Sequence, residues 1–172
     1  VPGDVSSTVR AVLLGFLCVL CASIALGCSS DEGSWRASNG EIAVSRVAAP
    51  AAANVGSPDS ATMAVYATIA NTGVAADTLV PVTAIHAASA TLHTTMDHGG
   101  TQMMMPAEPV AIAPGSVVRL APGRTHVMLE GLTRRFVAGD TMPLTFVFRR
   151  SGAVSVNASV FAYEDLQRAL EP

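Results

Sequence analysis

Short runs of alternating apolar and polar residues, each closed by a turn signal, fill the chain from residue 41 onward. In "ATMAVYATIAN" (61–71), Met63, Val65, Ala67 and Ile69 fall on one face, and the run ends in Asn-Thr-Gly, a turn sequence. Similar runs cover 41–47, 77–84, 89–96, 102–106, 109–115, 116–123, 125–132, 142–150 and 153–163. Because no helical pattern alternates with them, they predict an all-β antiparallel β-sandwich or Greek-key barrel of about eight or nine strands.

The composition excludes several classes of protein. The 172 residues are 50% hydrophobic and 13% charged, which is too apolar for a disordered chain, and the net charge of −3 argues against nucleic-acid binding. The chain has no Gly-rich phosphate loop and no G-x-S-x-G nucleophile motif. Asp97, Glu108 and Glu130 do not form a convincing acid/base pair, so we expect no glycosidase-like or hydrolase site. We expect a protein that is not an enzyme.

The N-terminal segment has the pattern of an export signal helix. An apolar run at 11–26 follows Arg10, and Gly27-Cys28 then precedes a polar stretch, as at a bacterial lipoprotein cleavage site. Ala25 stands where such sites usually have leucine, so lipidation of Cys28, simple cleavage and an uncleaved anchor all remain open. Each alternative predicts an exported protein, periplasmic or at the cell surface, and lipidation would tether it to the membrane.

The same patterns divide the chain into four parts. We expect a signal peptide or lipoprotein anchor at 1–28, a polar linker at 29–40, a β-sandwich domain at 41–163 and a C-terminal tail at 164–172 with one short helical turn. All three cysteines (Cys18, Cys21 and Cys28) lie in the first part, so the exported domain has no disulfide and no thiolate ligand of its own.

Histidine and methionine gather between residues 93 and 128. His126 and Met128 lie two apart on a predicted strand, and therefore share one face about 7 Å apart. His93 and Met104 lie on either side of a Gly turn, and in an antiparallel sandwich these segments can meet at one end. Two imidazoles and two uncharged thioethers favour Cu(I) over zinc or harder ions, and the missing cysteine argues against a blue-copper carrier.

The remaining histidines and methionines have weaker assignments. Met103 and Met105 flank Met104 on the opposite face of a regular strand, and we expect at least one of them to pack in the core. Met96 and His98, near the turn, are candidate auxiliary ligands. The others are expected at a strand end (His86) and in the core or at strand starts (Met63 and Met142).

At these residues the chain resembles the bacterial PCu(A)C copper chaperones, whose signature is His, ten residues, Met, twenty-one residues, His-x-Met. His93, Met104, His126 and Met128 match it without a gap, and the resemblance covers about residues 41 to 160. It implies a cupredoxin-like sandwich with a Cu(I) site near the surface, formed by these four residues. It also implies delivery of copper outside the cytoplasm, to an acceptor such as the Cu(A) site of cytochrome c oxidase subunit II. Separately, we expect the protein to be a monomer.

Two departures from the family pattern are visible. Gln102 stands where many members have a methionine, and the C-terminal end, "QRALEP", lacks their His/Met-rich tail. Two rival functions also remain. The first is copper buffering or resistance without a dedicated acceptor, and the second is a structural sandwich that binds no metal.

Overall fold

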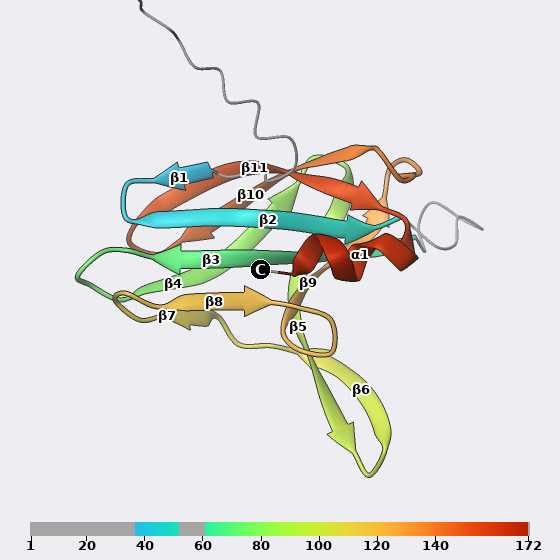
Figure 1. Cartoon of the computed structure of the whole chain (residues 1–172), viewed down its shortest axis with the longest axis horizontal. Helices are drawn as coiled ribbons and strands as arrows, with labels where there is room; N and C mark the ends of the chain where they lie inside the picture. Colours follow the sequence, from blue (N-terminus) through green and yellow to red (C-terminus); the bar gives the residue numbers. More distant parts are fainter. Residues whose placement is uncertain (1–36, 52–60, 172) are drawn as a thin grey trace, which may run out of the picture. The chain divides into compact units, whose positions relative to one another are not determined.

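The computed structural model describes residues 37–51 and 61–171, and within them the protein is built almost entirely of β-strands (Figure 1). The strands are β1 (Ala37–Asn39), β2 (Ile42–Pro50), β3 (Thr62–Asn71), β4 (Asp77–Ala84), β5 (Ala87–His98), β6 (Thr101–Pro106), β7 (Val110–Ile112), β8 (Val117–Leu120), β9 (His126–Leu132), β10 (Thr141–Phe148) and β11 (Gly152–Phe161). One helix, α1 (Tyr163–Leu170), follows them. The prediction of an all-β fold is confirmed, although the described residues form eleven strands and not the eight or nine predicted.

The strands pair in the order β6-β5-β9-β3-β2-β11-β10-β4-β7, with β1 added beside β2 and β8 beside β3. Strand β3 is shared along its length: its first half (Thr62–Val65) pairs with β9, and its second half (Ala67–Ala70) pairs with β8. All these pairs are antiparallel except one, because β11 runs parallel to β2 at Ala48–Pro50. The antiparallel prediction is therefore wrong for this pair alone, which joins strands far apart in the sequence that no hairpin turn connects.

Alternation builds the core as the sequence predicts. Met63, Val65, Ala67 and Ile69 of β3 are all buried, and they share the core with every second residue of β10 (Met142, Leu144, Phe146 and Phe148). Met63 and Met142 are thus core residues, as expected. Strand β6 differs, because all six of its residues are exposed. Its hairpin with β5 projects beyond the other strands (Figure 1).

Three local features refine the sequence prediction. Pro81 lies where the register between β4 and β10 shifts, which fits the bulge expected there. Residues 37–39 form β1, whereas the polar composition of 29–40 predicts a linker there. The tail forms the two-turn helix α1 and not a single turn, because Leu166 is buried against Ala48 and Tyr66. Among the described residues, no helix is both long and apolar enough to cross a membrane.

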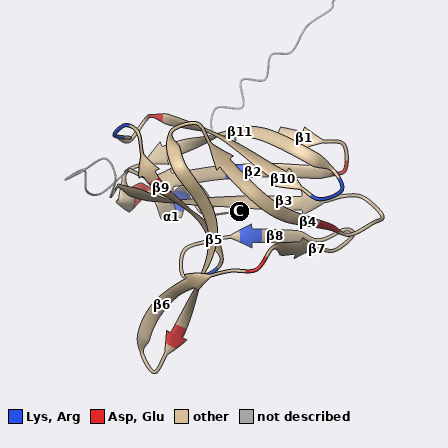
Figure 2. Cartoon of the chain, turned by 180° about the vertical axis from the view of Figure 1, so that it is seen from behind, with Lys and Arg blue, Asp and Glu red and all other residues tan. Residues whose placement is uncertain are grey.

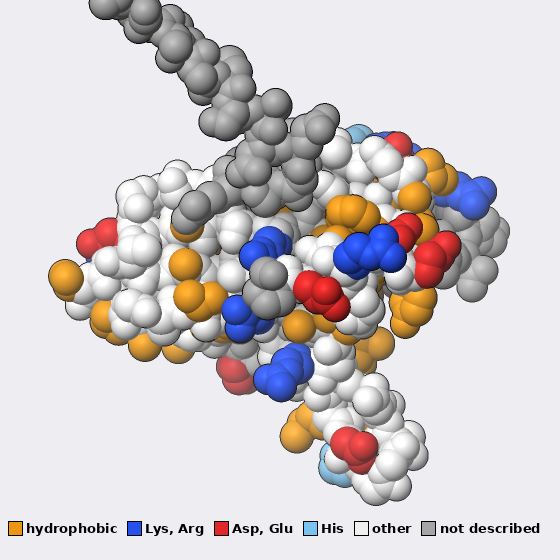
Figure 3. Space-filling view, viewed as in Figure 1, with side chains coloured by type: hydrophobic (Ala, Val, Ile, Leu, Met, Phe, Trp, Pro, Cys, Tyr) orange, Lys and Arg blue, Asp and Glu red, His pale blue; other side chains and the backbone are white. Residues whose placement is uncertain are grey.

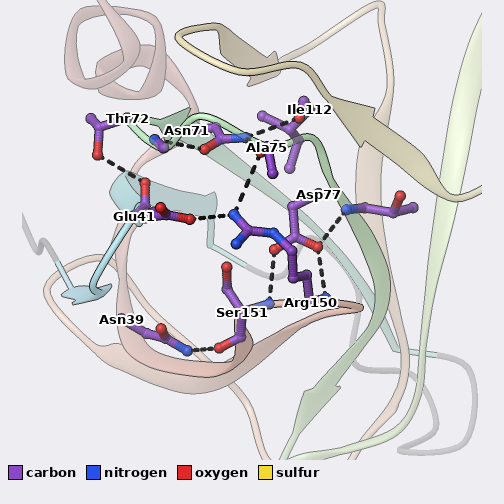
Figure 4. A network of polar contacts seen from close by, with 11 residues as sticks. Asn39, Glu41, Asn71, Thr72, Ala75, Asp77, Ile112, Arg150 and Ser151 are labelled. Atoms are coloured by element: carbon purple, nitrogen blue, oxygen red, sulfur yellow. Dashed lines mark hydrogen bonds and ion pairs between the residues drawn. The ribbon is translucent and has the colours of Figure 1, made fainter.

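A buried carboxylate holds the end of the sandwich where β4 begins (Figure 4). Asp77 is 3% exposed, and its oxygens accept hydrogen bonds from the backbone N–H groups of Thr78, Arg150 and Ser151 at 2.7, 2.9 and 2.9 Å. Burial alone would raise the pKa of Asp77, but these bonds and one from the Ser151 side chain outweigh it and lower the pKa to about 2. The Arg150 side chain pairs with Glu41, so the β10–β11 turn is tied to β2 and β4.

Candidate metal centre

The pairing of strands β5 and β9 places the two candidate histidines directly opposite each other. His93 is directly opposite His126 of β9, and the centroids of their rings lie 6.3 Å apart in an edge-on arrangement. Residues directly opposite in an antiparallel pair point to the same side of the sheet. The imidazoles therefore share one face, although 33 positions in the sequence separate them.

The two candidate methionines lie on this same face. Met128 is two residues beyond His126 and opposite Thr91, while Met104 of β6 is opposite Thr95, two residues beyond His93. Since every second residue of a strand points the same way, the register places His93, Met104, His126 and Met128 on one side of the β6-β5-β9 sheet. Met104 and Met128 flank the histidine pair from opposite directions, so their long thioether arms have to reach inward to meet.

Burial falls steadily across the four side chains. His126 is 4% exposed, His93 and Met128 are half-buried, and Met104 is 56% exposed. The group thus runs from the wall of the sandwich to solvent. His126 is held in place by packing, whereas the exposed Met104 side chain can contact another molecule.

The hydrogen bonds of His126 leave one ring nitrogen free. Its Nδ1 lies 2.9 Å from the carbonyl oxygen of Arg124. A carbonyl can only accept, so Nδ1 carries the proton and the lone pair of Nε2 is available. Metal-binding histidines are commonly oriented by such a bond from the other nitrogen.

His93 has an orphaned nitrogen. Its Nε2 lies 3.2 Å from the hydroxyl of Thr91, whereas its Nδ1 is buried and has no hydrogen-bond partner among the described residues. A buried polar atom without a partner costs free energy of about 1–3 kcal/mol. A metal ion at Nδ1 would remove that cost, so the residues fit a bound cation.

Few charged groups surround the four side chains, and those on the same face accept hydrogen bonds from the chain. On the same face, Glu130 accepts a hydrogen bond from Ser89, and Asp97 accepts one from the backbone N–H of Gly100. The described part of the chain contains no group of three or more His, Cys, Asp or Glu side chains placed to hold a metal ion. Asp97 is the one charged residue in the β5 and β6 sequences, and Figure 2 shows an acidic segment on this hairpin with no basic one. The donor set is therefore soft and neutral.

Tyr66 forms the inner wall of the site. Its ring centroid is 6.1 Å from that of His126, and Leu166 of α1 packs over it. Burial, with a smaller contribution from Tyr163, raises the pKa of Tyr66. Sequence reasoning missed Tyr66, Thr91 and the Arg124 carbonyl. Only Thr91, two residues before His93, had a signal in the strand alternation.

The other sulfur and imidazole side chains fall elsewhere. Met96, His98, Met103 and Met105 lie on the opposite face of the β5–β6 hairpin. Core packing of Met103 or Met105 was predicted wrongly: they are 50% and 44% exposed, because β6 pairs only with β5 and nothing covers it. His86 lies between β4 and β5, as expected of a strand-end histidine, with its Nδ1 3.3 Å from the hydroxyl of Thr133.

Solved structures similar to this chain show which class of protein it belongs to. The chain is similar to the apo PCuAC domain from PmoF1, with a TM-score of 0.62 and 26% identity over 74% of this chain and 98% of that domain. It is also similar to the copper-bound PCuAC domain from PmoF2, with a TM-score of 0.61 and 23% identity over 74% of this chain and 97% of that one. The fold is thus the cupredoxin-like β-sandwich of PCuAC domains, and the resemblance drawn from the sequence is confirmed.

A family model described as "Putative lipoprotein LpqE-like" matches residues 42–160. The chain is 32% identical over 144 residues to "Putative lipoprotein Lxx21020" of Leifsonia xyli subsp. xyli (strain CTCB07), an alignment that covers 83% of this chain and 80% of that protein. The chain therefore belongs to the LpqE-like family. The predicted export segment 1–28, with Cys28, lies outside the described residues.

Proposed function

We propose that the protein is an exported Cu(I) metallochaperone whose ligands are His93, Met104, His126 and Met128. The observation that carries this proposal is the register of β5 and β9, which sets His93 directly opposite His126 with Met128 on the same face. Met104 reaches that face from β6. The similarity to PCuAC domains, one of them copper-bound, supports copper as the cargo.

The chemistry of the donors selects the oxidation state. All four donors are neutral, and the two acidic side chains on the same face, Glu130 and Asp97, each accept a hydrogen bond, from Ser89 and from Gly100. A monovalent ion leaves less uncompensated charge against the buried His126 than a divalent ion does, and thioether sulfur prefers soft Cu(I). The protein should therefore bind Cu(I) more tightly than Cu(II).

The gradient of exposure suggests how the cargo leaves. Met104 is exposed at 56% on a projecting hairpin, whereas His126 is fixed by the Arg124 carbonyl and by Tyr66. A sulfur or nitrogen donor of an acceptor protein would replace Met104 first, and the histidines would release copper last. No step requires a catalytic residue, so we regard the protein as a carrier and not an enzyme.

The acceptor and the location complete the proposal. We infer delivery to an extracytoplasmic copper protein such as the Cu(A) site of cytochrome c oxidase subunit II, by a 41–163 domain tethered through lipidated Cys28. The lipoprotein descriptions of the family and of its relative support the tether. Mass spectrometry of the mature N-terminus checks it: a diacylglyceryl modification on Cys28 is expected, and an unmodified N-terminus rejects the tether.

A chelator competition tests the metal site. Wild type, His126→Ala and Met128→Ala are titrated with Cu(I) against a chromogenic chelator, with His86→Ala as the matched control at a histidine outside the site. Each site variant should bind at least about tenfold more weakly, a loss of about 1.4 kcal/mol, while His86→Ala and the circular dichroism spectra stay unchanged. Unaltered affinity in both site variants rejects these ligands.

A further inference from the structure

The β5–β6 hairpin has a second group of soft side chains on the face turned away from His93. Met96 is directly opposite Met103, Thr94 is opposite Met105, and His98 is opposite Thr101. Because alternate residues of a strand share a face, Met96, Met103 and Met105 point to the same side, together with His98. Figure 3 shows hydrophobic side chains and a histidine at the surface of this hairpin.

Core packing does not explain these methionines. Nearer the sandwich this face is part of the core, since Leu92 pairs with Val127 and packs against the buried cluster. Strand β9 begins at His126, opposite His93, so beyond that point β5 has only β6 beside it. Met96, Met103 and Met105 are consequently 48%, 50% and 44% exposed. Three large apolar side chains left in solvent on one patch point to a ligand or partner.

The spacing of the sulfurs suits one soft ion. Directly opposite residues in an antiparallel pair have Cβ atoms about 4.5–5.5 Å apart, and diagonal neighbours such as Met96 and Met105 lie about 7–8 Å apart. Methionine is unbranched and flexible, so three thioethers at these positions can turn toward a common point. His98 adds an imidazole one row further out.

The charges of the hairpin favour a soft monovalent cation. Asp97 is the sole charged residue in β5 and β6, it belongs to the His93 face, and its carboxylate caps the turn at Gly100. Magnesium and calcium prefer several charged oxygen donors and zinc prefers imidazole, thiolate or carboxylate, whereas this face offers no carboxylate or thiolate, only the His98 imidazole and the hydroxyls of Thr94 and Thr101 beside its three thioethers. Thioethers select Cu(I).

We propose that Met96, Met103 and Met105, assisted by His98, form a second Cu(I) site on the reverse face of the hairpin. The site goes beyond the proposed function, because it uses none of the four ligands named there. It shares strand β6 with Met104, whose neighbours on both sides are Met103 and Met105. Copper on the reverse face therefore sits one residue away from the ligand proposed to exchange first.

Stoichiometry tests this site directly. Wild type, the triple variant Met96→Leu/Met103→Leu/Met105→Leu and the double variant His126→Ala/Met128→Ala are titrated with Cu(I) under reducing conditions, and bound copper per chain is counted. Leucine keeps the patch apolar and removes only the sulfur, so the hairpin and any hydrophobic docking surface survive. Two equivalents are expected for wild type, and one for each variant.

The outcomes separate the two sites. If the triple leucine variant binds as many equivalents as wild type, the second site is rejected, whatever that number is, and the patch acts only as an apolar surface. If the triple variant loses one equivalent but the double variant loses none, the reverse-face site stands and the proposed function fails. Methyl NMR gives a second readout: the ε-methyl signals of Met96, Met103 and Met105 should shift with Cu(I) in the double variant.

Discussion

The two ends of the sandwich treat their polar side chains in opposite ways. At the end where β4 begins, the Asp77 carboxylate is buried and accepts three backbone hydrogen bonds. At the β5–β6 end, Nδ1 of His93 is buried without a partner, and Met104 is exposed. Polar groups that stabilise the fold find their hydrogen-bond partners within the chain, whereas groups that bind a ligand leave a donor or acceptor atom unpaired.

The difference extends to packing. Asp77 binds the turn that follows β10, whose alternate residues are fully enclosed in the core, while every residue of β6 is exposed. One end should therefore govern global stability and the other should govern metal affinity. The two properties should respond to different substitutions.

The largest effect is expected from Asp77→Ala. The change leaves the backbone N–H groups of Thr78, Arg150 and Ser151 without their acceptor, and should lower the free energy of unfolding by about 3 kcal/mol. Urea denaturation measures the loss. Cu(I) affinity of the folded variant should match wild type, since the His93 face is at the other end of β3. A large drop in affinity would show that the two ends are coupled.

Lowering the pH should remove the stabilisation that the Asp77 carboxylate provides, without any mutation. The pKa of Asp77 is about 2 when folded and 3.8 in an unperturbed chain. Because the folded pKa is depressed, the stabilisation is complete above about pH 4 and is lost as pH falls toward 2, amounting to about 2 kcal/mol. Denaturation curves between pH 5 and 2, at roughly half-unit steps, should be steeper in pH for wild type than for Asp77→Asn. Equal slopes would contradict the role given to this carboxylate.

A smaller effect is expected at Met104, and it concerns binding alone. Met104→Leu should weaken the His93 site by about tenfold, about 1.4 kcal/mol, with no change in unfolding free energy because the side chain is exposed. Met103→Leu is the matched control on the opposite face of the same strand. The measurement is chelator competition in a background lacking Met96 and Met105. Equal affinities of the two variants would remove Met104 from the ligand set.

Much of this organisation follows from local pattern. Alternation in β3 and β10 placed Met63 and Met142 in the core, and it placed His126 and Met128 on a shared face. These inferences succeed because the period of a strand is fixed by its backbone.

The pairing across strands had no comparable signal. A one-residue slip between β5 and β9 would move His93 to the opposite face, and only the packed core selects the register seen. The exposure of Met103 and Met105 depends on where β9 begins, which no residue of β6 encodes. Likewise, Tyr66 meets His126 through tertiary packing, and the parallel contact of β11 with β2 joins segments from the two ends of the domain.

The most direct test of the central claim is X-ray absorption of the Cu(I) complex at one equivalent, in the Met96→Leu/Met103→Leu/Met105→Leu background that leaves only the His93 face. If the sheet register gathers His93, Met104, His126 and Met128 around one ion, the copper edge should be cuprous and the first shell should contain two sulfur and two nitrogen scatterers. A first shell of nitrogen and oxygen alone, without sulfur, would contradict the account.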